Sequence, residues 1–152
     1  MKKKIFLYIF LLLCNIYCFC QKDTDKRYQV YEETLIRLID YMDSIFSDKD
    51  TISYFFEKVN GITDSFPQFV KNHKIIVLDL KEIDSIIQSH FLILWTIFPI
   101  IIEKGQFRVR IFNEQVSKFG NSQGMSRLGM GILDCIFLYD YEQERFVFEK
   151  WL

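Results

Sequence analysis

Cysteine, proline and histidine are all scarce in this chain, and their scarcity excludes several kinds of site. Four of the 152 residues are cysteine, and two each are proline and histidine. Because three of the cysteines lie within the first 20 residues, Cys135 stands alone in the remainder, where no intrachain disulfide can form. His73 and His90 make no zinc-binding spacing with Cys135, so we expect neither a metal nor another cofactor.

An excess of positive charge is also missing. The chain has 19 lysines and arginines against 20 aspartates and glutamates, a formal net charge of −1. The first 20 residues hold three lysines and no acidic residue, so without them the balance is 16 − 20 = −4. Proteins that bind nucleic acids normally show a basic surface, and we therefore expect no nucleic-acid partner.

The N-terminal segment is typical of a secretory signal peptide. Lysines at positions 2–4 precede an apolar run, and polar sequence begins at Gln21. The run ends at Cys20 and is shorter than the roughly 20 apolar residues that span a bilayer. We expect residues 1–20 to be a cleaved signal peptide. Residues 21–152 then form a single domain outside the cytoplasm, in the periplasm or secreted, with no stable membrane span.

Two alternatives to a cleaved and soluble form remain open. Acylation on Cys14, Cys18 or Cys20 would make the protein lipid-anchored, and an uncleaved segment would anchor it directly. The residues before these cysteines are Leu13, Tyr17 and Phe19, which are larger than the small residue of a lipoprotein signal. The extracytoplasmic location is common to all three forms.

Helical spacing dominates the first third of the mature chain. Apolar residues recur every three or four positions from Tyr28 to Ile45, which predicts an amphipathic helix that begins at Thr24 or Asp25 and ends at 47–50. We predict a second helix at 51–59, ended by Asn60 and Gly61. We also predict a short helical turn within 63–70, with Asp64 or Ser65 as its cap and Pro67 in its first turn. Residues 73–80 read as a strand, and 81–88 fit either a helix or a strand.

Strand patterns dominate the remainder. Segments 91–102 and 106–112 flank Glu103-Lys104-Gly105, which is typical of a hairpin turn, and Pro99 interrupts the first of them. Segments 132–141 and 145–152 predict a second hairpin. Helices followed by an antiparallel meander indicate an α+β fold. We expect N-terminal helices packed on a curved antiparallel sheet, in the element order of cystatin-like or NTF2-like folds.

A glycine-rich segment, GNSQGMSRLGMG at 120–131, raises the question of a phosphate or nucleophile site. It matches no phosphate-binding loop, because Met130 stands where lysine is required, and no nucleophile turn, because Ser126 has one residue too many around it. No dinucleotide-binding glycine pattern opens a helix. The segment is best read as an inter-strand connection with a bulge near Gly129 or Gly131.

Few other side chains are candidates for function. In the glycine-rich connection a partner-binding loop would present Ser122, Gln123, Met125 and Arg127. On the strand 106–112 an exposed basic face would present Arg108 and Arg110, with Phe107, Val109 and Ile111 on the opposite face. Asp79, Glu82 and Asp84 fit a solvated turn, and Cys135 fits a buried position within a strand. No catalytic set can be nominated from spacing.

The C-terminal part of the chain resembles a class of small exported bacterial α+β proteins of unknown function. The similarity covers roughly 97–152 and consists of FPIIIEKGQFRVRIFN and GILDCIFLYDYEQERFVFEKWL, in which a Pro-Ile strand turns through Lys-Gly and a Tyr-Asp hairpin leads to Phe-x-Phe. Such proteins often have a cysteine after the Tyr-Asp pair, where this chain has Tyr141. The resemblance implies no catalytic residue. Some exported proteins of this kind are immunity proteins against toxins delivered between bacteria.

These features favour an exported, non-enzymatic protein that binds a protein partner, of an immunity type or in the envelope. The alternative is a small NTF2-like enzyme or ligand-binding protein, whose acidic or histidine side chains would meet in a pocket only after folding.

Overall fold

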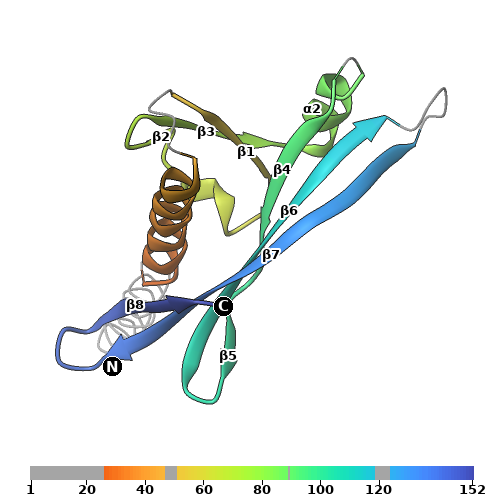
Figure 1. Ribbon diagram of the computed structural model, residues 1–152. Coiled ribbons are helices and arrows are strands. Elements are labelled where there is room, and N and C mark those ends of the chain that lie inside the picture. Colours follow the sequence, from red (N-terminus) through yellow and green to blue (C-terminus); the bar gives the residue numbers. More distant parts are fainter. Residues whose placement is uncertain (1–25, 47–50, 89, 119–123) are drawn as a thin grey trace, which may run out of the picture.

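The computed structural model describes residues 26–46, 51–88, 90–118 and 124–152 (Figure 1). The predicted signal peptide, the predicted helix boundaries at Thr24, Asp25 and 47–50, and two residues of the candidate loop, Ser122 and Gln123, lie outside these ranges. Within them the fold is α+β, with a long helix at 26–45, a shorter helix and an open, mixed sheet of eight strands.

The long helix 26–45 follows the predicted stripe of apolar residues. Val30, Leu35, Leu38 and Ile39 are fully buried, whereas Phe46, just after the last helical residue, is 52% exposed. The hydroxyl of Thr34 is buried and donates to the carbonyl oxygen of Val30, one turn back along the helix. The stripe therefore enters the core over most of the helix and emerges from it at the C-terminal end.

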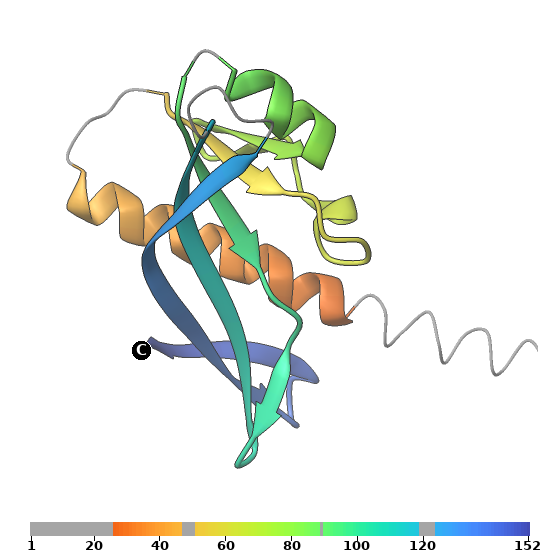
Figure 2. The same ribbon diagram turned by 90° about the vertical axis from the view of Figure 1, so that its right-hand side faces the viewer.

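Eight strands and a second helix follow the long helix. Their bounds in chain order are β1 Ser53–Glu57, β2 Phe69–Val70, β3 His73–Leu78, α2 Leu80–Ile86, β4 Leu92–Ile97, β5 Ile101–Glu103, β6 Gln106–Lys118, β7 Met125–Asp140 and β8 Arg145–Trp151, with a short 3-10 helix at Thr63–Ser65 after β1. The order in the sheet is β2-β3-β1-β4-β6-β7-β8, and β5 pairs with β6. Figures 1 and 2 show the long β6–β7 pair crossing beside the long helix.

The predicted second helix at 51–59 is wrong, because this segment contains the strand β1. Burial alternates along it: Tyr54 and Phe56 join the core cluster that includes the long helix, and Phe55 packs against the cluster of α2. Aromatic residues are frequent in strands, and a strand that is covered on both faces reads as a continuous apolar run. β1 lies parallel to β3 and to β4, so the sheet is mixed and the expectation of a wholly antiparallel sheet is also wrong.

A capping box settles the ambiguous segment 81–88 as a helix. The carboxylate of Asp79 accepts the N–H groups of Lys81 and Glu82, and the carboxylate of Glu82 accepts the N–H of Asp79. Two of the three acidic residues noted in the sequence therefore stabilise the first turn of α2, which buries Ile83 on the sheet side. Asp84 is exposed.

Both predicted hairpins are confirmed. Pro99 lies between β4 and β5, and Lys104 and Gly105 turn β5 into β6 with φ values of 51° and 78°, which suit a tight hairpin. In the turn from β7 to β8 the carboxylate of Asp140 accepts the N–H groups of Glu142 and Gln143. The helical turn predicted within 63–70, with Pro67 in its first turn, is misplaced: the 3-10 helix covers Thr63–Ser65 and ends before Phe66, whose backbone is extended.

Most of the glycine-rich segment is strand and not connection, because β7 begins at Met125. Asn113 pairs with Gly131 and Glu114 with Gly129, which leaves Met130 as the extra residue of a bulge. The bulge predicted near these glycines is confirmed, and the predicted loop is too long. A Cβ at Gly129 would lie 2.8 Å from the ring of Phe112, so the glycine lets this ring lie across the strand.

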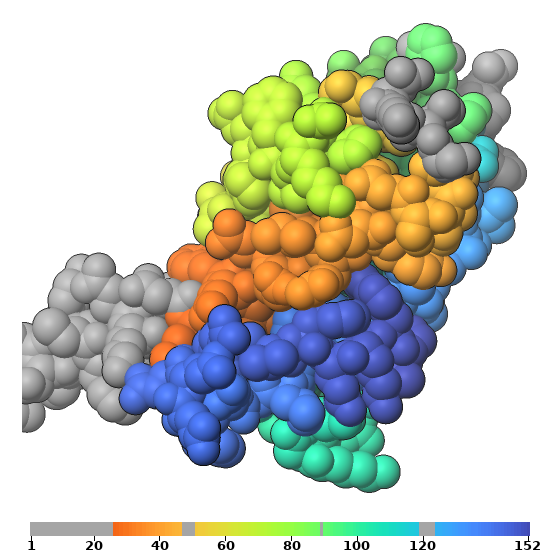
Figure 3. All heavy atoms as spheres, turned by 60° about the vertical axis from the view of Figure 1, so that its left-hand side comes forward, coloured from red at the N-terminus to blue at the C-terminus, as the bar shows by residue number. Residues whose placement is uncertain are grey.

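Two apolar clusters lie on opposite faces of the sheet. The larger one joins buried residues of the long helix to Trp95 and Ile97 of β4, Val109 and Ile111 of β6, and Cys135 and Phe137 of β7. The smaller joins Ile83 and Ile87 to Leu78, Leu92, Leu94 and Val116. In the space-filling view the long helix lies between the β2–β3 region and β8 (Figure 3).

The thiol of Cys135 is expected to be unreactive in the folded protein. Burial raises its pKa to about 12, so little thiolate forms near neutral pH. In the chain that starts at Gln21, where Cys135 is the only cysteine, alkylation should be roughly a thousandfold slower than for a free thiol. Alkylation should become rapid in concentrated urea. Fast reaction without denaturant would contradict the buried position.

Candidate binding groove

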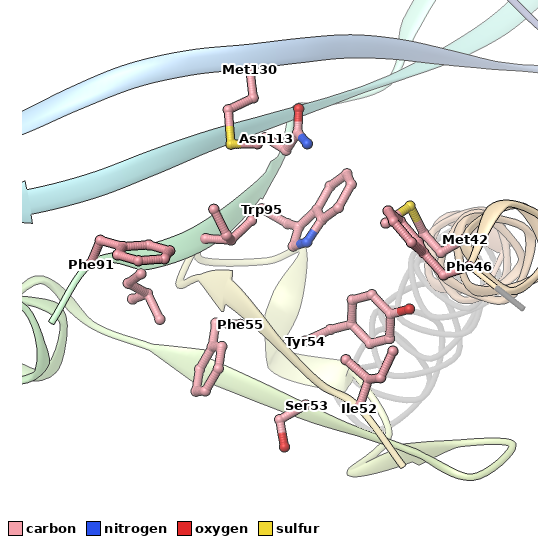
Figure 4. Close-up of a pocket in the computed structure, with 12 residues that line it drawn as sticks. Met42, Phe46, Ile52, Ser53, Tyr54, Phe55, Phe91, Trp95, Asn113 and Met130 are labelled. Carbon is pink, nitrogen blue, oxygen red and sulfur yellow. The ribbon is translucent and has the colours of Figure 1, made fainter. Parts of the chain in front are cut away.

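An apolar groove of about 510 Å³ lies where the C-terminal end of the long helix faces β1, β4 and the bulge between β6 and β7. Figure 4 shows Trp95 at its centre, with Met42 and Phe46 on the helix side, Tyr54 below and Met130 above. The volume falls within the range of roughly 300–1,000 Å³ typical of ligand pockets. The residues that line it are Met42, Phe46, Ile52, Ser53, Tyr54, Phe55, Phe91, Leu92, Ile93, Trp95, Asn113 and Met130.

Three local features bring these side chains together. The helical stripe continues past the core to Met42 and Phe46, which no strand covers completely. The two-residue period of β4 places Trp95 on the face of the sheet that the long helix shares. In the bulge Met130 is an extra residue of β7 between the partners of Asn113 and Glu114. Its side chain lines the groove together with that of Asn113.

The apolar surface extends beyond the groove. Phe46, Phe91 and Met130 line it and are each more than half exposed, and so are Ile45 beside Phe46 and Leu128 two residues before Met130. Scattered exposed apolar residues are ordinary, but several around one concavity mark a site of interaction. The groove thus has an apolar floor and an apolar margin.

Three polar groups at the groove have no hydrogen-bond partner among the side chains of the described residues. Within the described residues, the indole N–H of Trp95, the hydroxyl of Tyr54 and the amide of Asn113 make no side-chain hydrogen bond. Burial, and to a lesser degree the negative charge of Asp43, raises the pKa of Tyr54, so its hydroxyl stays protonated. These groups are available to hydrogen-bond a bound molecule.

Tyr54 is the only titratable side chain among the described residues that line the groove. The lining therefore offers no carboxylate, imidazole, amine or thiol for acid–base or nucleophilic catalysis. No group of three or more histidine, cysteine, aspartate or glutamate side chains that could hold a metal ion occurs in the described part of the chain.

His73 and Asp43 do meet, but behind the groove. Nε2 of His73 lies 2.9 Å from the Asp43 carboxylate, and its Nδ1 accepts the backbone N–H of Ile52 at 3.2 Å. The imidazole is buried and packs edge-on against the ring of Tyr54. Because both nitrogens are engaged within the protein, this imidazole fixes the end of β3 and leaves no nitrogen for a substrate. His90 is exposed and lies just before β4 in the chain.

Arg127 lies in β7 and takes part in a charged network on the face of the sheet that α2 covers. Its guanidinium contacts Glu114 of β6 at 2.6 Å and both carboxylate oxygens of Glu57 of β1 at 3.0 Å. The hydroxyl of Thr96 donates to Glu57 as well. The Arg127 hydrogen bonds lower the pKa of Glu57, and the bond to Glu57 raises the pKa of Arg127. Arg127 thus ties the far half of β7 to β1 and β6.

The other residues singled out in the sequence lie outside the groove. Met125 packs against the α2 cluster. Arg110 forms a two-point ion pair with Asp134, at 2.8 and 2.9 Å. Arg108 lies 3.3 Å from Glu103 and 3.7 Å from Asp134. The charges of both arginines are therefore offset by neighbouring carboxylates.

The sequence carries little signal for the groove, because its residues come from five separate parts of the chain. The one available clue was the apolar stripe of the long helix, which continues to Phe46 beyond what a core needs. Comparison of the chain with protein-family models, curated proteins and solved structures found no match. Neither helix in the described ranges is long and apolar enough to cross a membrane.

Replacing Glu57 by glutamine should weaken the network around Arg127. The folded-state pKa of Glu57 is lowered, so its contribution to stability is present above its ordinary pKa of 4.5 and is lost as the pH falls through the folded value. We expect Glu57→Gln to reduce the free energy of unfolding by about 1–3 kcal/mol at neutral pH, and by less in acid. Urea unfolding at both pH values measures the difference. Glu149→Gln, at an exposed carboxylate, should change little at either pH.

Proposed function

We propose that the protein is a non-enzymatic binding protein, and that the groove receives an apolar segment of a protein partner. The observation that carries this proposal is the apolar groove whose margin continues into exposed Phe46, Phe91 and Met130. A pocket for a small molecule normally encloses most of its ligand. A concavity surrounded by exposed apolar side chains suits the larger surface of a protein.

The types of side chain support a protein partner too. Tryptophan and tyrosine are enriched among residues that dominate binding energy at protein interfaces, and Trp95 and Tyr54 line the centre of the groove. Methionine adapts its shape to different apolar partners, and Met42 and Met130 stand on opposite sides. The unpaired polar groups of Trp95, Tyr54 and Asn113 can hydrogen-bond the partner's backbone.

The enzyme alternative has less support. It requires a histidine or carboxylate in a cavity, whereas the described residues of the groove lining include neither and His73 is engaged through both ring nitrogens. The proposal includes the finer arrangement expected from the sequence: a helix packed on a curved sheet, in a cystatin-like or NTF2-like order. In such an arrangement the open end of the helix–sheet interface is a natural place for a binding site.

The proposed location is outside the cytoplasm, on the basis of the N-terminal signal sequence. An immunity protein is one form of this function, as the resemblance of the C-terminal part suggests. This form requires a toxin gene next to the gene for this chain and protection of growth when the two are expressed together. A neighbouring toxin that still kills would contradict the immunity form and leave the binding function in place.

Phe46→Ser should weaken binding of an uncharged aromatic probe, N-phenyl-1-naphthylamine. Loss of one large apolar side chain from the groove should raise the dissociation constant about tenfold. Probe fluorescence measures it, with energy transfer from Trp95 in a Trp151→Phe background. Phe69→Ser is the matched control, since Phe69 is 58% exposed, like Phe46, but lies on β2 outside the groove. Equal effects of both variants would contradict binding in the groove.

A photo-crosslinking residue at Phe91 should capture the partner in the native envelope. The same residue at Tyr141, which is 85% exposed and does not line the groove, should not. Mass spectrometry identifies the product. Capture at both positions alike would indicate random collision, and capture at neither would contradict the proposed site.

A further inference from the structure

Half of β7 is an open edge of the sheet. β6 pairs with β7 from Met125 to Phe137, but β8 pairs only with Cys135 to Asp140, and Leu152 adds one backbone pair with Asp134. In the described part of the chain no strand lies on the other side of residues 125–133. Along an antiparallel strand the backbone groups not used by one neighbour point toward the other side, where they can pair with an added strand.

This edge has little of the protection that edge strands usually carry. Residues 127–132 are all exposed, and charged side chains or proline normally prevent pairing at such a position. Arg127 is the only charged residue among them, and its guanidinium is engaged by Glu57 and Glu114 of its own chain. The bulge at Met130 divides this edge into two regular parts, one at 125–129 and one at 131–133.

The edge and the groove are continuous. Met130 belongs to both, and Leu128 pairs with Gln115 of β6, two residues from Asn113 in the groove lining. Figure 4 places Met130 above Asn113 at the groove. A strand added along β7 would therefore lie at the mouth of the groove, and alternate side chains of that strand would face it.

The geometry points to an extended segment of the partner that adds to the open edge of β7 and places its alternate apolar side chains in the groove. This inference rests on the proposed function and specifies how the partner binds. The segment is uncharged on the side that faces the groove, because the described residues of the lining include no charged side chain to serve as the counterpart of a buried charge.

The test uses a blocked peptide of about eight residues that alternates threonine and valine, added to the protein that starts at Gln21. Its control has proline in place of each valine, which removes half of the backbone donors and disfavours a regular strand. We expect the alternating peptide to bind at least about tenfold more tightly than the proline peptide. It should also slow hydrogen exchange of the amides at 125–133. Similar affinities, or unchanged exchange at these amides, would overturn the proposal.

Leu128→Lys, which places a charge on the open edge, should reduce the affinity for the alternating peptide about tenfold. Leu138→Lys is the matched control on the same strand, because Leu138 is 44% exposed but pairs with Val147 of β8. Equal losses for both variants would overturn the proposal. So would concentration-dependent protection of 125–133 in the protein alone, because a second copy would then occupy the edge.

Fluorescence of Trp95 separates this inference from the proposed function. Peptide binding that protects the edge amides and also changes Trp95 emission in the Trp151→Phe background supports both. Protection without a change at Trp95 supports strand addition and contradicts the use of the groove. A change at Trp95 without protection of the edge amides overturns strand addition and leaves the groove as a binding site.

Discussion

One core cluster joins the long helix 26–45 to β1, β4, β6 and β7, and the other features of the molecule depend on it. Large apolar side chains each contribute roughly 1.5–3 kcal/mol when buried, so a stripe of them on one helix strongly favours a fixed position. The hydroxyl of Tyr31 on the helix accepts the N–H of Ile100, and Arg37 lies over the ring of Phe148 in β8. The helix is held along its length, and its last turn projects beyond the cluster.

The groove is a consequence of this arrangement. The stripe that buries Leu35 and Leu38 continues to Met42, which is partly buried against the cluster, and to Phe46, which is 52% exposed. On the sheet side the bulge at Met130 shifts the register of β7 and carries a methionine to the same place. The end of the long helix and the bulge of β7 meet at this place, and their apolar side chains remain partly exposed.

The opposite face of the sheet carries the α2 cluster and a charged network. There α2 covers one end, and the network of Glu57, Glu114 and Arg127 connects β1 with the far half of β7. Glu114 is almost completely buried, so its charge needs the guanidinium close by. This network fixes Arg127 of β7 from the face of the sheet opposite the groove. We infer that it thereby also helps to position Met130, three residues later, on the groove side. Breaking the network is therefore expected to disturb the groove as well as stability.

Much of the fold could be predicted from the sequence, because its signals are local. The helical stripe from Tyr28, the turn at Lys104 and Gly105, the break at Pro99 and the bulge near Gly129 each depend on a few adjacent residues. β1 could not, since its five residues carry three aromatics that fit a helix or a strand until the sheet covers both faces. A local pattern does not contain that tertiary contact.

The candidate site could not be predicted for a related reason. Each of its residues, taken alone, is an ordinary core or surface position, and only folding brings Phe46, Tyr54, Trp95 and Met130 to one concavity. The glycines and the charge around Arg127 suggest a binding loop in the sequence, yet Arg127 lies in β7 and its charge is paired with Glu57 and Glu114. In the described part of the molecule Arg110 and Arg127 are paired with carboxylates, whereas Phe46, Phe91 and Met130 at the groove remain more than half exposed. If the groove binds a partner as proposed, the binding energy comes mainly from apolar burial, which selects a partner by shape and by the absence of charge.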